Sequence, residues 1–192
     1  MILDGWGQGA KDDSDGIFRA HTPFIDSLYN GAHSTLKTFG ENVGLPTGQM
    51  GNSEVGHLNI GAGRIVYQDL LKIDNAVQDG SFFENQVLLD AFSKAKSAGK
   101  KVHLLGLVSD GGVHSSLEHL FAICDLAKRQ NFDNFFIHAF TDGRDCSPTS
   151  GVNHLQNLEN HLSKTGGKIA TVIGRYFAMD RDKRWERVKK AY

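Results

Sequence analysis

The chain has 192 residues, 40% of them hydrophobic and 22% charged, a globular composition that excludes disordered and fibrous proteins and fits one large or two small domains. Its 21 basic and 22 acidic residues are spread along the chain and leave a net charge of −1, so we expect no nucleic-acid partner and no membrane contact. Two cysteines, Cys124 and Cys146, are too few for a disulfide framework and lack the spacing of a zinc motif, which favours a reducing, cytoplasmic compartment.

Residues 1 to about 65 are rich in glycine and poor in long apolar runs. Ile2-Leu3 is interpreted as the end of a buried strand, although strands usually have about five or six residues. Asp4 follows at the strand terminus and precedes the turn Gly5-Trp6-Gly7, a common position for a metal ligand. The glycines of this turn lack the spacing of a dinucleotide-binding loop, so that alternative carries little weight.

The segment from Gly48 to His57 places Ser53 among glycines at the predicted start of a helix. Free backbone N–H groups and the helix dipole at such a position favour a bound phosphate and developing negative charge. An ordinary helix N-cap is the simpler explanation for a lone serine. His57 could face the same side as Ser53, but we interpret it as a packing residue.

The rest of the chain repeats a buried strand followed by a polar loop. The strands are predicted at 102–108, 135–140 and 169–173, and their near-continuous apolar runs are typical of parallel strands covered on both faces. Helical spacing of apolar residues appears between them, at 117–127 and 152–162. This alternation predicts an α/β fold with a doubly wound parallel sheet.

Ligands of open α/β sheets bind beyond the carboxyl ends of the strands. The three predicted ends supply acidic, basic and imidazole side chains: Asp110, His114, Asp142, Arg144, Asp145, Arg175, Asp180 and Arg181. Arginine suits phosphate and carboxylate groups, and histidine moves a proton near neutral pH. For any single residue a loop salt bridge is the simpler explanation, but the repetition at three ends favours an anion pocket with acid–base capacity.

Long ordered motifs run through the whole chain. They are Ile2–Gly7, Gly44–Arg64, Ser109–Ser115, Asp142–Asp145, Gly174–Tyr176 and Met179–Arg187. Together they closely resemble the cofactor-independent phosphoglycerate mutases. The resemblance implies an alkaline-phosphatase-like α/β domain, represented in part by residues 1–68, with an inserted α/β phosphotransferase domain, represented in part by residues 69–192.

The same resemblance implies an activity. Family members interconvert 3-phosphoglycerate and 2-phosphoglycerate, in glycolysis and gluconeogenesis, without 2,3-bisphosphoglycerate. Ser53 would carry the phosphoryl group as a phosphoserine and would, with Asp4, ligate two divalent metal ions, expected to be manganese. The residues that match substrate-binding positions are His114, Arg144, Asp145, Arg175 and Arg181, and Asp145 would exchange protons with the glycerate hydroxyls.

Family members are more than twice as long as this chain, and their other metal ligands lie in the later portion. The helical pattern from Trp185 to Tyr192 also has no cap, so we expect a fragment cut at both ends. Asp4 and Ser53 are then the only two plausible ligands for an ion that takes about six. We therefore expect the chain as given to be inactive, and the complete protein to be a monomer.

Two alternatives to the mutase remain open. One is another metal-dependent enzyme of the wider group, such as a phosphopentomutase or a simple phosphatase. The other is a non-catalytic phosphoglycerate-binding module or an inactive remnant. Cys146, beside Asp145, could be a reactive thiol, but we interpret it as a variable loop residue.

Overall fold

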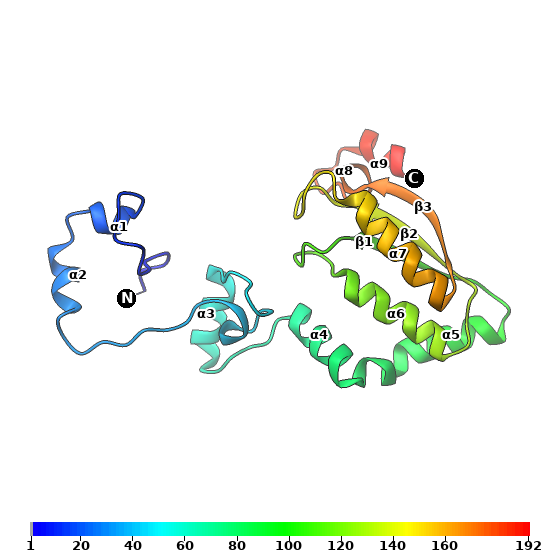
Figure 1. The fold of residues 1–192 in the computed structure, drawn as a ribbon, viewed down its shortest axis with the longest axis horizontal. Coiled ribbons are helices and arrows are strands. Elements are labelled where there is room, and N and C mark those ends of the chain that lie inside the picture. Colours follow the sequence, from blue (N-terminus) through cyan, green and yellow to red (C-terminus); the bar gives the residue numbers. More distant parts are fainter. Residues whose placement is uncertain (1) are drawn as a thin grey trace. The chain divides into compact units, whose positions relative to one another are not determined.

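The computed structural model describes residues 2–192, which divide into two compact units with the division after Leu71 (Figure 1). Each unit has its own core of buried apolar side chains. The division lies within three residues of the boundary expected from the sequence.

The first unit consists of short helices joined by loops. Its elements are α1 (Gly16–Arg19), α2 (Pro23–Leu28), the 3-10 helix η1 (Gly40–Val43) and α3 (Ser53–Ala62). The prediction of a strand ending at Ile2-Leu3 is wrong for the described residues, because Leu3 accepts a hydrogen bond from Trp6 N at 3.1 Å in a turn. No strand lies between residues 2 and 71, so these residues have no neighbouring strand to supply backbone partners.

Helix α3 is fixed to the 3-10 helix by one asparagine. Asn59 Nδ2 donates to Val43 O at 3.0 Å, and Asn59 Oδ1 accepts from Val66 N at 2.6 Å. The apolar side chains buried at this junction are Val43, Leu45 and Val55. So small a core means that a few polar contacts largely determine the position of α3.

The second unit contains every strand of the described chain. Its elements follow α4 (Asp69–Asp79) in the order η2 (Ser81–Glu84), α5 (Gln86–Ser97), β1 (Val102–Val108), α6 (Leu117–Arg129), β2 (Phe135–Thr141), α7 (Gly151–Thr165), β3 (Lys168–Gly174), α8 (Arg175–Ala178) and α9 (Trp185–Ala191). The predicted strands and the helices between them are confirmed, with ends that differ by up to three residues. The α/β class with a parallel sheet is confirmed as well.

The sheet has the order β1-β2-β3, and both strand pairs are parallel. Val102 pairs with Phe135 and Val108 with Thr141, so β1 and β2 end level with each other. Thr141 in turn pairs with Gly174 at the end of β3. The loops that follow the three strands therefore start at the same edge of the sheet.

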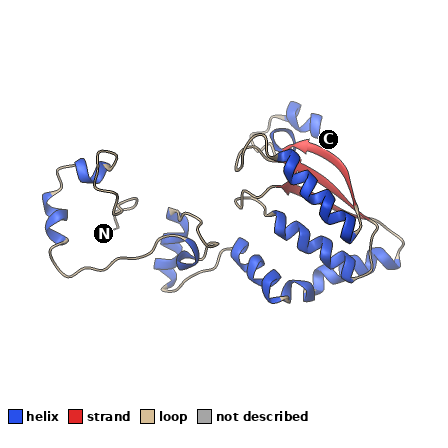
Figure 2. Cartoon of the chain, in the orientation of Figure 1, coloured by secondary structure: helices blue, strands red, loops and turns tan. Residues whose placement is uncertain are grey.

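Helices α6 and α7 cover one face of this sheet and pack beside each other (Figure 2). The core between them and the strands includes Leu126, Phe135 and Leu158, each 0% exposed. On the opposite face Leu105 is 67% and Val172 is 52% exposed. The expectation that both faces are covered is therefore wrong for residues 2–192. Consecutive strand order with right-handed crossovers puts both connecting helices on the same side.

None of the helices in the described part of the chain combines the length and the apolar character needed to cross a bilayer.

Candidate functional site

Ser53 is the first residue of α3, and its hydroxyl lies against a carboxylate. Ser53 Oγ donates to Asp4 Oδ2 at 2.7 Å, although the two residues are 49 positions apart in sequence. Asn52 caps the helix, since its side-chain oxygen accepts from Val55 N at 3.1 Å. The cap is therefore Asn52, which leaves the Ser53 hydroxyl free to contact Asp4.

His57 lies one helical turn beyond Ser53 and is exposed. Its Nδ1 is 2.8 Å from the carbonyl oxygen of Ser53 and 3.2 Å from Ser53 Oγ. A carbonyl oxygen only accepts, so Nδ1 carries the proton and cannot take one from the hydroxyl. The interpretation of His57 as a packing residue is wrong, and Asp4 is the group placed to accept the Ser53 proton.

The loop before Ser53 is held by a close backbone approach. A Cβ at Gly51 would collide with the carbonyl oxygen of Thr38, so a side chain has no room there. Close by, Gly40 N donates to Gln49 O at 2.9 Å. The glycines of this segment thus serve backbone packing that fixes the start of α3.

The oxygen donors at Ser53 suit a hard cation. A carboxylate and a hydroxyl at 2.7 Å from each other are ligands that magnesium and manganese prefer over nitrogen or sulfur donors. Ser53 is exposed, so a cation could reach the pair without a rearrangement of the core. The residues present therefore fit such an ion, although two ligands alone would hold it weakly.

A second group of charged residues surrounds a hollow of about 600 Å³ in the second unit. Its lining comes from the loops after the three strands and from α8 and α9: His114, Asp142, Gly143, Arg144, Gly174, Arg175, Tyr176, Met179, Asp180, Arg181, Asp182 and Arg187. Four guanidinium groups and one imidazole thus share a hollow with three carboxylates. Such a lining can bind a small anion that carries phosphate or carboxylate groups.

Arg175 joins two carboxylates at the centre of this group. Its Nη1 donates to Asp142 Oδ1 and to Asp145 Oδ2, each at 2.7 Å. Asp142 also accepts from Ser109 Oγ at 2.6 Å and from the backbone N–H groups of Arg144 and Asp145 at 3.0 and 3.1 Å. Asp142, with a side chain only 2% exposed, therefore ties the ends of all three strands together.

These contacts keep both carboxylates ionised at neutral pH. Burial acts to raise the pKa of Asp142, but hydrogen bonds from Ser109 and Arg175 outweigh it and hold that pKa well below its usual value. A hydrogen bond from Arg175 is the main cause of the lowered pKa of Asp145, and His114 adds to it. Desolvation opposes the charge of Arg175, yet its two carboxylate partners raise its pKa.

His114 is oriented by Asp145. Its Nδ1 lies 3.0 Å from Asp145 Oδ2, and an ionised carboxylate only accepts, so Nδ1 carries a proton. The imidazole is partly exposed and lines the hollow. The other ring nitrogen, Nε2, is thereby left for a ligand.

The remaining arginines of the hollow are more exposed. Arg144 Nε is 3.9 Å from Asp145 Oδ1, with a side chain 65% exposed. Arg181 is exposed and has no hydrogen bond or ion pair within residues 2–192. Arg187 stacks over the Tyr176 ring at 3.9 Å from its centroid. Arg181 is therefore the arginine whose charge is least compensated by the protein.

The structure groups the candidates from the sequence into two sets. Asp4 and Ser53 meet in the first unit, whereas His114, Arg144, Asp145, Arg175 and Arg181 belong to the group around the hollow, in the second unit. The position of Asp142 directly after a buried strand assigns it to the predicted anion pocket, although the family resemblance does not include it among the substrate-binding residues. Arg187 is a lining residue that the sequence does not single out, because nothing local to it distinguishes it from a surface residue.

Comparisons with known proteins give a consistent result. A family model described as "BPG-independent PGAM N-terminus" matches residues 73–192. The 2,3-bisphosphoglycerate-independent phosphoglycerate mutase of Bacteroides fragilis is 60% identical over 193 residues, and the match covers 100% of this chain. The corresponding protein of Flavobacterium johnsoniae is 56% identical over 193 residues. The chain spans 38% of the length of each of these relatives.

A solved structure is also similar. It is a phosphoglycerate mutase of Leishmania mexicana, determined at low cobalt concentration, with 37% sequence identity and a TM-score of 0.69. The match covers 98% of this chain and 36% of that one. At this identity the likeness extends to sequence as well as fold.

Proposed function

Because the chain belongs to the BPG-independent phosphoglycerate mutase N-terminus family, we propose that it supplies the nucleophile and part of the substrate pocket of a mutase. The reaction would interconvert 3-phosphoglycerate and 2-phosphoglycerate through a phosphoserine at Ser53. The names of the relatives support independence from 2,3-bisphosphoglycerate.

The observation that carries this proposal is the hydrogen bond from Ser53 Oγ to Asp4 Oδ2 at 2.7 Å. A free serine hydroxyl is a weak nucleophile, and an adjacent base activates it. Two divalent metal ions, expected to be manganese and held in part by Asp4 and Ser53, would lower the pKa of the hydroxyl and neutralise charge on the phosphoryl group. Ser53 also begins a helix of ten residues, whose free N–H groups favour a phosphate there.

The residues around the hollow would bind the glycerate part. Arg144, Arg175 and Arg181 carry planar guanidinium groups suited to carboxylate and phosphate. His114 would donate from Nε2 while Asp145 holds its other nitrogen. This division of roles places substrate recognition in the second unit and the nucleophile in the first.

Proton transfer is assigned to Asp145. In the first half-reaction the Ser53 O–P bond forms, the bond from phosphorus to the O3 oxygen breaks, and O3 receives a proton. In the second half the C2 hydroxyl attacks the phosphoserine and loses a proton, and Ser53 recovers its hydroxyl. The proton that O3 receives would be the one that Ser53 gives up. Asp145, which its lowered pKa keeps ionised, would take the proton of the C2 hydroxyl and release it as Ser53 recovers its hydroxyl, so that it ends each turnover ionised.

We also propose that residues 1–68 belong to an alkaline-phosphatase-like domain and residues 69–192 to an inserted phosphotransferase domain of a cytoplasmic monomer. The division of the structure after Leu71 supports this boundary. Asp4 and Ser53 supply two ligands, whereas a manganese-like ion takes about six. We therefore expect residues 1–192 alone to bind the metal weakly and to show no turnover.

The test is mutase activity of the complete protein, with manganese and without 2,3-bisphosphoglycerate, for the wild type, Ser53→Ala and Ser27→Ala. Ser27 is a matched control, because it is an exposed helical serine whose hydroxyl donates to the backbone oxygen Phe24 O, at 2.7 Å, within its own helix. We expect Ser53→Ala to lower kcat by about 10⁴-fold or more, as loss of a nucleophile does elsewhere, and Ser27→Ala to leave it unchanged.

A phosphoserine at Ser53, trapped by rapid quenching and located by mass spectrometry, would support the covalent step. Normal turnover by Ser53→Ala would contradict it. A complete protein that cleaves other phosphate esters but not phosphoglycerate would point to a phosphatase or phosphopentomutase. One that binds phosphoglycerate without turnover would point to a non-catalytic module.

A further inference from the structure

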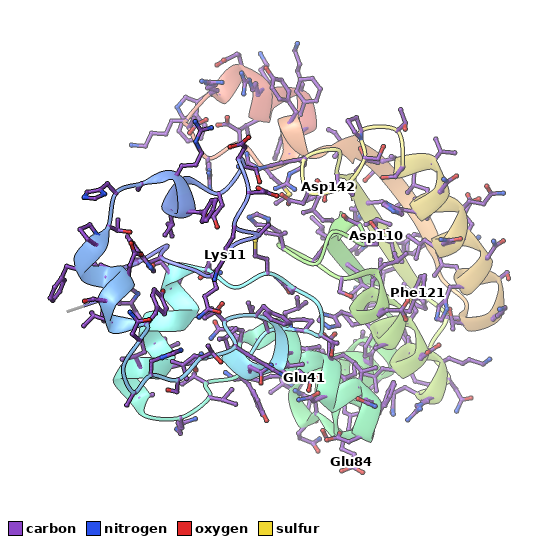
Figure 3. The ribbon with its side chains drawn as sticks, turned by 60° about the vertical axis from the view of Figure 1, so that its left-hand side comes forward. Lys11, Glu41, Glu84, Asp110, Phe121 and Asp142 are labelled. Atoms are coloured by element: carbon purple, nitrogen blue, oxygen red, sulfur yellow. The ribbon has the colours of Figure 1, made fainter. Side chains whose placement is uncertain are left out.

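Three side chains of different chemistry meet outside the lining of the hollow, on the loops after β1 and β2 and on α7. They are Asp110, Cys146 and His154, and one potential ligand atom of each lies within 4.8 Å of the other two. Figure 3 shows Asp110 and Asp142 in the two loops. The loops touch, since a Cβ at Gly111 would be 2.8 Å from the carbonyl oxygen of Asp145.

The sulfur of Cys146 has lone pairs available. Two hydroxyls approach it, Ser109 Oγ at 3.7 Å and Ser150 Oγ at 3.2 Å. Each hydroxyl has a single proton and a closer oxygen partner, Asp142 Oδ2 at 2.6 Å for Ser109 and Ser147 O at 2.8 Å for Ser150. Because oxygen is a stronger acceptor than sulfur, each hydroxyl proton goes to its oxygen partner, and neither hydroxyl forms a strong hydrogen bond with the sulfur.

The imidazole of His154 is buried and has one polar contact. Its side chain is 7% exposed, and its Nε2 lies 3.1 Å from Asp110 Oδ1. Its Nδ1 is buried without a hydrogen-bond partner in the described part of the chain. A buried polar ring with half of its hydrogen-bonding capacity unused is costly unless another interaction compensates it.

The open side of the cluster is Asp110, whose side chain is 68% exposed. A cation could therefore enter from solvent, and a water could take a further coordination position. Ligand atoms around a tetrahedral zinc are roughly 3.3–3.8 Å apart, as bond lengths of about 2.0–2.3 Å require. The three potential ligand atoms lie within 4.8 Å of one another, so a contraction of at most about 1 Å brings the widest separation into this range.

We propose that Asp110, Cys146 and His154 form a binding site for a zinc-like divalent cation. Thiolate, imidazole and carboxylate together are zinc ligands, whereas magnesium, calcium and manganese prefer oxygen alone. The site thus differs in chemistry from the oxygen donors of Asp4 and Ser53. A cation here fastens the β1 loop to the β2 loop, and so stabilises the pair formed by His114 and Asp145 at 3.0 Å.

Cobalt is the probe for this site, because a thiolate ligand gives Co²⁺ a charge-transfer absorption in the near ultraviolet that oxygen ligands do not give. The chain of residues 1–192 is titrated with Co²⁺ under reducing conditions, and Zn²⁺ is then added. We expect the absorption to saturate at one equivalent and to disappear with Zn²⁺. The measurement needs no enzymatic activity, so its outcome is independent of the proposed mutase function.

Variants identify the ligands. Cys146→Ser should abolish the absorption, and His154→Gln and Asp110→Asn should each weaken Co²⁺ binding by at least about 10-fold. His161→Gln is the matched control: this histidine is on the same helix and contacts Asp125 at 2.9 Å, without a cysteine. Circular dichroism of His154→Gln checks its folding, and the exposed Asp110 gives a second variant that spares the core.

Three results would overturn the proposal. The first is a wild-type chain without the charge-transfer absorption. The second is an absorption that survives in Cys146→Ser, which would require Cys124, a thiol that is 0% exposed and whose pKa burial raises to about 12. The third is an equal weakening of Co²⁺ binding in the His154→Gln and His161→Gln variants.

Discussion

An Asp142→Asn substitution would remove one negative charge from the point where the three strand ends meet. Asp142 Oδ1 accepts from Arg175 and from two backbone N–H groups, and Oδ2 accepts from Ser109. Asparagine keeps one oxygen in place, and its amide can donate to the Ser109 hydroxyl. The substitution therefore removes mainly the charge that faces Arg175, with little change in shape.

The expected cost follows from the burial of this pair. Removal of one partner from a buried ion pair typically costs about 3–5 kcal/mol. Arg175 keeps Asp145 at 2.7 Å, so the guanidinium is not left alone and the cost falls to the lower end of this range or slightly below it. We expect a loss of about 2–3 kcal/mol in the free energy of unfolding, or roughly 10 °C in Tm for a unit of this size.

The pH dependence has a defined sign. Asp142 has a folded pKa below its unfolded value, so its contribution is complete above the unfolded pKa of about 3.9 and is lost as pH falls through the folded pKa. The wild type should lose stability below about pH 4, whereas Asp142→Asn should lose less. The difference between the two should therefore narrow with acidification.

Thermal and urea unfolding, followed by circular dichroism between pH 7 and pH 3, would measure both effects. Asp182→Asn is the control, because this carboxylate also lines the hollow but is exposed, and its side chain makes no hydrogen bond or ion pair within residues 2–192. If Asp142→Asn is no less stable than Asp182→Asn at pH 7, the buried carboxylate does not hold the strand ends together. A difference that stays constant down to pH 3 would refute the assigned ionisation.

Two further predictions concern the two sites. Gly51→Ala should destabilise the first unit by about 1–3 kcal/mol, because the added Cβ would collide with Thr38 O. Gly56→Ala, inside α3, should be neutral or stabilising, because nothing lies within 4 Å of its Cβ. Limited proteolysis would compare the two variants, and equal effects on stability would contradict the packing argument. Arg175→Lys in the complete protein should raise KM for phosphoglycerate by about 10-fold or more, because an ammonium cannot reproduce a planar fork, and an unchanged KM would remove Arg175 from the substrate pocket.

Strands and helices of the second unit could be predicted because their signal is local. The apolar runs at 102–108, 135–140 and 169–173 and the helical spacing between them determine the elements. The strand order, and the covering of one face where two were expected, depend on how the elements pack. The residues at the strand ends followed as candidates, since parallel strands start their loops at one edge. The first unit lacked such a signal: at Ile2-Leu3 the sequence suggested a strand, but strand formation depends on a neighbour.

Contacts between distant segments were decided only by tertiary structure. Sequence could nominate Asp4 and Ser53 by resemblance, but not their 2.7 Å hydrogen bond across 49 positions. The sequence suggested a packing role for His57, because helical spacing alone does not show which atoms a ring nitrogen will contact in the folded protein. It gave no indication that Cys146 and His154 would lie together, since metal-ligand spacing is recognisable only when the ligands share a local motif. Local sequence determines backbone conformation, whereas the partner of a side chain depends on how whole elements pack.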